Sequence, residues 1–216
     1  MRVSVVSLAA FAVTALAACV HINDVQVASI QPRYVRPTPA SRSGVPVAVI
    51  YDPQELPDTV TLSGPEGLPH AKLLGARALV TEHLRRALEA LFERVSVVSA
   101  ASQPTDDGLL CTVHFVDAGL AMAPGGNTLV GTLEWSVALR RAGQSRVLYS
   151  WGERTVGTRE GAGSFGQFDP APVVQGAIEA SLRAMLKDMD AKGVVAFTAS
   201  DAPAAEAPAP AAAQPK

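Results

Sequence analysis

Imidazole and thiol groups are the side chains of this chain that could bind a metal ion or act as nucleophiles. Its histidines are His21, His70, His83 and His114, and each falls in a different expected element. Cys111 and His114 are three residues apart in an expected strand, so their side chains point to opposite faces and cannot share a metal. A zinc site needs three or four converging ligands. The sequence therefore predicts no metal site and no bound cofactor.

Hydroxyl and glycine-rich motifs are equally poor candidates for catalysis. Ser164 lies in Gly163-Ser164-Phe165-Gly166, which lacks the spacing of a nucleophile elbow. The glycines of Pro124-Gly125-Gly126-Asn127 precede an expected strand, whereas a phosphate cradle needs a helix N-terminus. Cys111 shares the apolar face of its strand and is most simply a small buried hydrophobe. We expect no catalytic residue and therefore no enzyme, and a hydrolase is the least favoured of the functions considered.

The residues around Cys19 predict a different use for a thiol. Met1-Arg2 precedes an uncharged, apolar run over residues 3–18, which is typical of a secretory signal and shorter than the ~20 residues needed to span a bilayer. Leu16-Ala17-Ala18-Cys19 resembles the lipobox of bacterial lipoproteins. The resemblance implies cleavage between Ala18 and Cys19 and acylation of Cys19, palmitate included. Several acyl chains on one cysteine make a stable membrane anchor. The alternative is an ordinary signal peptide followed by a chance cysteine.

The residue after the cysteine indicates which membrane holds the anchor. An Asp directly after the lipidated cysteine would resemble an inner-membrane retention signal. Here that position is occupied by Val20. We therefore expect an outer-membrane lipoprotein whose body faces the periplasm. The formal net charge of −2 carries no basic patch, so nucleic acid is excluded as a partner.

The composition divides the chain into four segments. Residues 1–18 are the signal peptide. Residues 19–44 carry the lipidated Cys19 and Pro32, Pro37 and Pro39, and we interpret them as an extended tether that lifts the domain off the membrane. Residues 45–198 form one domain. Residues 199–216, rich in Ala and Pro, are predicted to be a disordered tail.

Hydrophobic periodicity predicts the elements of that domain. Apolar residues at both faces indicate a buried strand, alternation indicates a half-covered strand, and spacing of three to four residues indicates an amphipathic helix. The expected strands are 45–51, 95–98, 109–121, 129–140 and 146–157, and the expected helices are 73–94 and 171–190. Asp169-Pro170 suits the start of the last helix. The order predicts an α+β fold: a mainly antiparallel sheet of four to five strands with two amphipathic helices packed on one face.

This order of elements over residues 45–190 resembles the YajG-type small envelope lipoproteins. It is more distantly similar to the lipoprotein subunit of the lipopolysaccharide translocon. The likeness lies in the helix-to-strand passage 84–98 and in the hairpin that leads through 157–168 into the last helix. It implies a part in envelope maintenance without identified chemistry, and it offers no catalytic residue.

Two non-enzymatic functions remain. The first is an accessory or structural lipoprotein that binds an envelope protein partner through a sheet face or edge. The second is a carrier or sensor that holds a lipid or glycan fragment. Exposed apolar surface would favour the first and an enclosed apolar pocket the second. The oligomeric state is left open.

The loop 157–168 is the candidate partner-binding segment. It combines four glycines with Phe165 and Phe168, and exposed aromatic rings on a loop supply contact area for recognition. The alternative is that both rings fold under the last helix and complete the core.

Overall fold

The computed structural model describes residues 21–26, 30–31, 42–64, 71–102, 108–124, 128–160 and 167–200. Strands and helices follow one another along the chain as β1 His21–Ile22, β2 Val25–Gln26, β3 Val47–Tyr51, β4 Thr59–Leu62, β5 Ala71–Leu74, α2 Ala76–Leu88, β6 Val95–Ser99, η2 Ala100–Ser102, β7 Leu109–Met122, β8 Thr128–Arg141, β9 Val147–Glu160, β10 Gln167–Phe168, α3 Ala171–Ala191 and α4 Val194–Ser200. The α+β prediction is confirmed.

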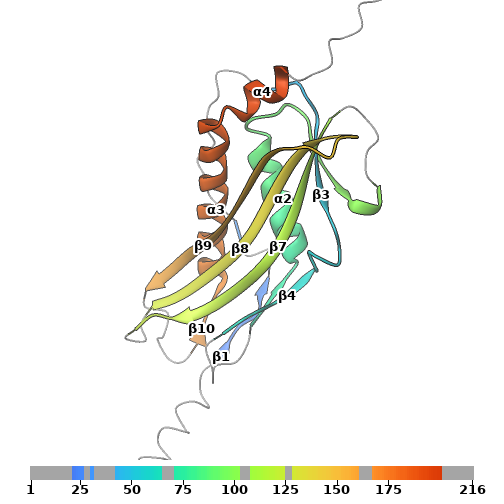
Figure 1. Cartoon of the computed structure of the whole chain (residues 1–216). Helices are drawn as coiled ribbons and strands as arrows, with labels where there is room; N and C mark the ends of the chain where they lie inside the picture. The colour runs from blue at the N-terminus through green and yellow to red at the C-terminus, as the bar shows by residue number, and fades with distance from the viewer. Residues whose placement is uncertain are drawn as a thin grey trace, which may run out of the picture.

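The main sheet has five strands in the order β6-β3-β7-β8-β9 (Figure 1). β7, β8 and β9 are antiparallel neighbours, as the alternating pattern predicted. β3 runs parallel to both β6 and β7, with Val49 opposite Val97 on one side and Cys111 on the other. A parallel neighbour requires a crossover connection, and α2 lies in the connection between β3 and β6. The apolar residues at both faces of β3 fit its place inside the sheet.

A second, three-stranded sheet in the order β2-β5-β4 was not expected from the sequence. The sequence pattern predicts a tether over β2, a loop over β4 and the start of β5, and the first turn of a helix at Leu73, which stands at helical spacing from Ala76. Each strand has at most four residues, too few to show a period. Ser63, just after β4, joins the two sheets: its amide donates to the Ala118 carbonyl at 2.9 Å, and its carbonyl accepts from the Leu120 amide.

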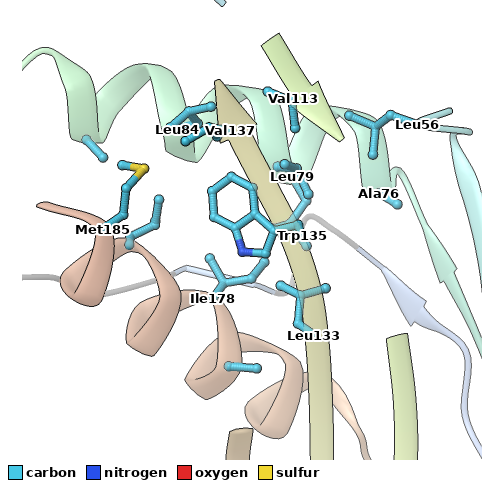
Figure 2. Packing of buried hydrophobic residues seen from close by; sticks show 14 of the residues in the cluster. Leu56, Ala76, Leu79, Leu84, Val113, Leu133, Trp135, Val137, Ile178 and Met185 are labelled. Carbon is cyan, nitrogen blue, oxygen red and sulfur yellow. The ribbon is translucent and has the colours of Figure 1, made fainter. Parts of the chain in front are cut away.

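Helices α2 and α3 cover one face of the main sheet (Figure 1). Trp135 of β8 lies between them, with Leu79 and Leu84 of α2 on one side and Ile178 and Met185 of α3 on the other (Figure 2). Its ring is only 2% exposed. The apolar stripes assigned to the two helices therefore face the sheet and each other.

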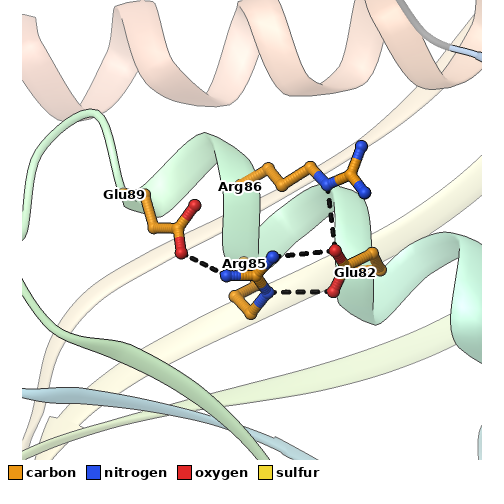
Figure 3. Close-up of polar contacts among 4 residues, drawn as sticks. All are labelled: Glu82, Arg85, Arg86 and Glu89. Carbon is orange, nitrogen blue, oxygen red and sulfur yellow. Dashed lines mark hydrogen bonds and ion pairs between the residues drawn. The ribbon is translucent and has the colours of Figure 1, made fainter.

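The outward face of α2 carries a chain of ion pairs. Arg85 contacts Glu82 at 2.8 Å and also Glu89, while Arg86 contacts Glu82 at 2.9 Å (Figure 3). The Arg85 guanidinium, with Arg86 beside it, lowers the pKa of Glu82 to about 2. Leu84, on the other face, is fully buried. The predicted polarity of this helix is confirmed.

Helix α3 lies against β9 at one very close contact. A Cβ atom on Gly157 would lie 2.0 Å from the Val173 carbonyl oxygen and 2.7 Å from the Ala177 nitrogen. Glycine is therefore required here, because any side chain would push helix and strand apart. Gly157 belongs to β9, as the expected strand 146–157 has it, and β9 continues to Glu160 into the segment expected to be a loop. Of that loop, residues 161–166 lie outside the described residues.

The chain continues past α3 into one more short helix. Gly193 has φ of 62°, the left-handed conformation expected at the exit of α3. The following α4 packs back on the sheet end, where Arg141 Nη2 donates to the Thr198 carbonyl at 3.1 Å. This helix was not predicted. The rest of the expected tail, residues 201–216, lies outside the described residues.

The stretch interpreted as a tether begins with residues that belong to the fold. β1 pairs with β10 and β2 with β5, both in parallel. Val25 is 1% exposed and Ile30 is 4% exposed, and both belong to the core. A free tether would leave these apolar side chains in water, so that interpretation is wrong for residues 21–26 and 30–31. Most of its remainder, 32–41, lies outside the described residues.

Candidate interaction surface

Buried hydroxyl groups join α3 to the sheet. Thr155 Oγ1 donates to the Ala177 carbonyl at 3.0 Å and lies 2.5 Å from Ser181 Oγ. Among the described residues, no imidazole or carboxylate contacts either hydroxyl. A serine without a neighbouring base is a poor nucleophile. This pair therefore fixes the position of α3.

Histidine and cysteine side chains lie apart from one another. His83 is buried on α2, and its burial, together with nearby Arg86, lowers its pKa. His114 is half exposed, with Nδ1 at 2.7 Å from Glu55 Oε2. Cys111 is buried on the opposite face of β7, and burial raises its pKa to about 12, so the thiol stays protonated. The predicted separation of Cys111 from His114 is confirmed, and the described part of the chain shows no cluster of three metal-ligating side chains.

The second face of the main sheet carries a small buried apolar cluster near β3, formed by Ala48, Ile50 and Leu110. Over β8 and β9 this face is mainly polar, and no described α-helix covers it (Figure 1). Along β8, residues that face the helices are buried and those that face away are half-buried. The outward residues include Glu134, which stands opposite Arg154 of β9 in the register. Val116 and Val156 are 60% and 50% exposed. Away from the cluster near β3, this face offers charged side chains and the exposed Val116 and Val156.

One edge of the main sheet is long and has no partner strand within the described ranges of the chain. β9 forms the end of the five-stranded sheet and runs for 14 residues, where ordinary strands have about 5–6. Apart from its ladder with β8, no backbone hydrogen bond joins β9 to another described residue. Its outer amides and carbonyls are therefore free to pair with another strand. Glu153 and Arg154 place charges at its middle, and such charges limit unspecific pairing.

A cavity of about 650 Å³ lies where β3, β6 and β7 begin. Its walls combine apolar and backbone surface with three charged residues, Glu89, Glu93 and Arg94. The volume is within the range of small-molecule sites. It is partly open and mixed in character, and it differs from the enclosed apolar pocket that a lipid carrier would need.

The residues singled out from the sequence fall mostly outside the described part. Ala18, Cys19 and Phe165 lie there. Phe168 is in β10, with its backbone opposite Ile22 of β1. The recognition-loop hypothesis is therefore not tested by the described residues. Among these residues, no helix is both long and apolar enough to cross a bilayer.

The free edge of β9 is a feature that periodicity could not find. Alternation predicted the strand but carries no information on its order in the sheet. The available signal was Val156, an apolar residue on the outward side of a strand that otherwise carries Ser150, Arg154 and Thr158 there.

Comparison with known proteins gives distant structural neighbours. No family model and no curated protein matches the sequence. The fold is similar to a Xanthomonas campestris protein of family DUF330, with TM-score 0.48 and 15% identity over 84% of this chain and 98% of that one. A proposed lipoprotein from Caulobacter crescentus has TM-score 0.37 and 12% identity over 73% and 93%. A proposed homologue of the neuraminyllactose-binding hemagglutinin from Helicobacter pylori has TM-score 0.37 and 8% identity over 79% and 98%. These values assign no family, and function must be argued from the chain's own residues.

Proposed function

We propose that this chain is a lipid-anchored, non-enzymatic accessory or structural protein of the bacterial envelope, of the YajG type. The lipobox-like Leu16-Ala17-Ala18-Cys19 supports the anchor, and Val20 supports the outer membrane with the domain facing the periplasm. The domain binds a protein partner of the envelope.

The observation that carries partner binding is the free edge of β9. A 14-residue strand with unpaired backbone groups is a template on which an extended segment of another protein adds as a new strand. Backbone hydrogen bonds supply affinity in this mode, and alternate side chains supply specificity. Val156, half exposed near the end of β9, would be covered by such a segment.

A carrier or sensor of a lipid or glycan fragment is the second candidate. It is favoured by one observation, the cavity lined by Glu89, Glu93 and Arg94. Its charged wall suits a polar glycan fragment better than an acyl chain. The free edge of β9 supports partner binding more strongly than the cavity supports a carrier, because its unpaired backbone groups can be satisfied by an added strand.

A charge placed on the edge tests this proposal. Val156→Lys adds a cation to the outer face of β9. Because Val156 is already 50% exposed, the free energy of unfolding should change by less than about 0.5 kcal/mol. Val116→Lys is the matched control, because Val116 is also exposed but lies on β7, inside the sheet. Both variants are crosslinked in intact envelopes, and the partner recovered with the wild-type chain is quantified. We expect the yield to fall at least tenfold for Val156→Lys alone.

The other outcomes are equally informative. Loss in both variants would move the binding site to the open face of the sheet. Full crosslinking in both would contradict the edge as the docking site. A ligand recovered with the purified protein and lost in Glu93→Ala would favour the carrier.

A further inference from the structure

We propose that the end of the domain formed by β1 and β10 sits directly on the bilayer surface, without a spacer. The inference rests on the lipid anchor of the proposed function. It adds the orientation of the domain and identifies the lipid headgroup surface as a second binding partner. The observation behind it is the very short distance along the chain between the anchor and the first strand.

A single residue, Val20, separates Cys19 from the first strand. β1 begins at His21, whose backbone lies opposite Gln167 of β10. An extended chain spans at most about 3.6 Å per residue, so Cys19 lies within about 7 Å of His21. Acyl chains on Cys19 are embedded in the membrane, and they therefore hold His21 at the headgroups.

The segment after Cys19 is fastened to the domain at successive points and cannot act as a tether. β1 pairs with β10. The Asp24 carboxylate accepts a hydrogen bond from the Lys72 amide at 2.8 Å. Val25 and Ile30 are buried in the core. The distance between membrane and domain is therefore set by Val20 alone.

The register identifies which end of the sheet faces the bilayer. Helix α3 begins directly after β10, and Val173 in its first turn contacts Gly131 of β8. Thr128, where β8 begins, is paired with Glu160, where β9 ends. These residues form the same end of the molecule as β1 and β10, whereas α4 lies at the opposite end (Figure 1).

This placement has two consequences for the surfaces described above. At about 3.3 Å per residue, the 14 residues of β9 reach roughly 45 Å, so the free edge extends from the membrane outward. The cavity lies at the far end, because Leu109 in its wall is paired with Arg141 at the end of β8.

Arg159, Glu160 and Asp169 near the membrane end carry opposite charges. The contact is therefore imposed by chain length and not by attraction to anionic lipid.

Two single-cysteine labels at opposite ends of one hairpin test the proposal. Glu160→Cys lies at the membrane end and Gln144→Cys lies at the far end, and both positions are exposed. Cys111 is buried and should not react in the folded protein. The full-length acylated protein is labelled with a fluorophore and reconstituted into phosphatidylethanolamine and phosphatidylglycerol vesicles that contain headgroup-spin-labelled lipid. We expect quenching of more than half of the fluorescence at Glu160→Cys and less than a tenth at Gln144→Cys.

A linker variant and the mass of the protein separate the possible failures. Insertion of 20 Gly and Ser residues between Val20 and His21 should keep the acyl mass and remove the quenching at Glu160→Cys. Equal quenching at the two positions, or none at either in acylated protein, would overturn the seated orientation while leaving the anchor intact. Absence of the acyl mass would overturn both the anchor and the orientation.

Discussion

Two ring nitrogens in the core have no hydrogen-bond partner among the described residues. They are His83 Nδ1 and Trp135 Nε1. Buried polar atoms are nearly always paired, because an unpaired one keeps the cost of leaving water. Trp135 offsets this cost through the apolar contacts of its large ring and an edge-to-face contact with Trp151 at 5.5 Å. The His83 ring has less apolar area than the Trp135 ring to offset this cost. The protonation state of His83 therefore has a larger effect on the stability of the fold.

The first prediction at this scale concerns acid stability. Burial lowers the pKa of His83 below 6.5, with Arg86 contributing, so the unfolded chain binds this proton more readily than the folded one. The stabilising contribution is present above pH 6.5 and is lost as the pH falls through the lower, folded pKa. We expect the free energy of unfolding to decline from pH 7.5 to pH 5, and to decline less in His83→Leu, as measured by urea titration.

Glu82→Gln is the control for that window. The pKa of the Glu82 carboxyl group is lowered from 4.5 to about 2 by its ion pairs with Arg85 and Arg86. Its stabilising contribution is therefore lost only as the pH falls from about 4.5 through 2. The variant should keep the decline between pH 7.5 and pH 5, and because the Glu82 charge raises the pKa of His83, the decline should be no smaller than in the wild-type protein. A His83→Leu protein with an unchanged slope would contradict the assignment.

At the scale of elements, the contact of α3 with the β8–β9 hairpin determines the shape of the molecule. Helix and strand run antiparallel, with Ala177 over Gly157 at one end and Asp188 bonded to the Tyr149 hydroxyl at 2.9 Å at the other. Burial of Tyr149 and its bond to Asp188 both raise the pKa of the phenol. The neutral phenol therefore remains a hydrogen-bond donor.

A methyl group at the closest point should separate the two elements. Gly157→Ala places Cβ against backbone atoms of Val173 and Ala177 that cannot rotate away, and we expect it to lower the free energy of unfolding by about 3 kcal/mol or more. Gly44→Ala is the control, because its Cβ would have Glu93 Oε2 as nearest neighbour at an ordinary 3.7 Å. Chemical denaturation compares the two. Similar stabilities would mean that α3 lies farther from β9.

Elements with a strong period could be predicted from the sequence, and short or pairing-dependent ones could not. β8 alternates over its whole length, and α3 carries an apolar stripe over 21 residues. β1, β2, β4 and β5 have two to four residues each, and their backbone bonds depend on partners far along the chain. The free edge of β9 follows from strand order, which alternation does not encode. The prolines after residue 31 favour an extended tether, and that interpretation was extended to the preceding residues although Val25 and Ile30 are buried in the core.

At the scale of the whole molecule, the N-terminal residues complete the core. Val25 belongs to β2, which pairs with β5 in the three-stranded sheet. This sheet joins the main sheet through the bridge between Ser63 and Gly119. The Gln31 amide lies 3.4 Å from Gln175 Oε1 of α3. The first described residues thus contact both the second sheet and the last long helix. The first described strands, the core and β9 are therefore parts of one folded unit.

Truncation tests whether this segment is a tether or part of the core. A chain that starts at Pro32 lacks Val25 and Ile30, each of which contributes about 1.5–3 kcal/mol when fully buried. Because the unfolded chain already buries some apolar surface, these values are upper estimates. We expect the free energy of unfolding to fall by about 3–5 kcal/mol relative to a chain that starts at His21, measured by urea denaturation with a melting curve as a second readout. Val25→Asp in the longer chain should reproduce part of the loss, because it buries a charge without removing the strand. A chain starting at Pro32 that is as stable as the longer one would restore the tether and, with it, a domain held away from the membrane.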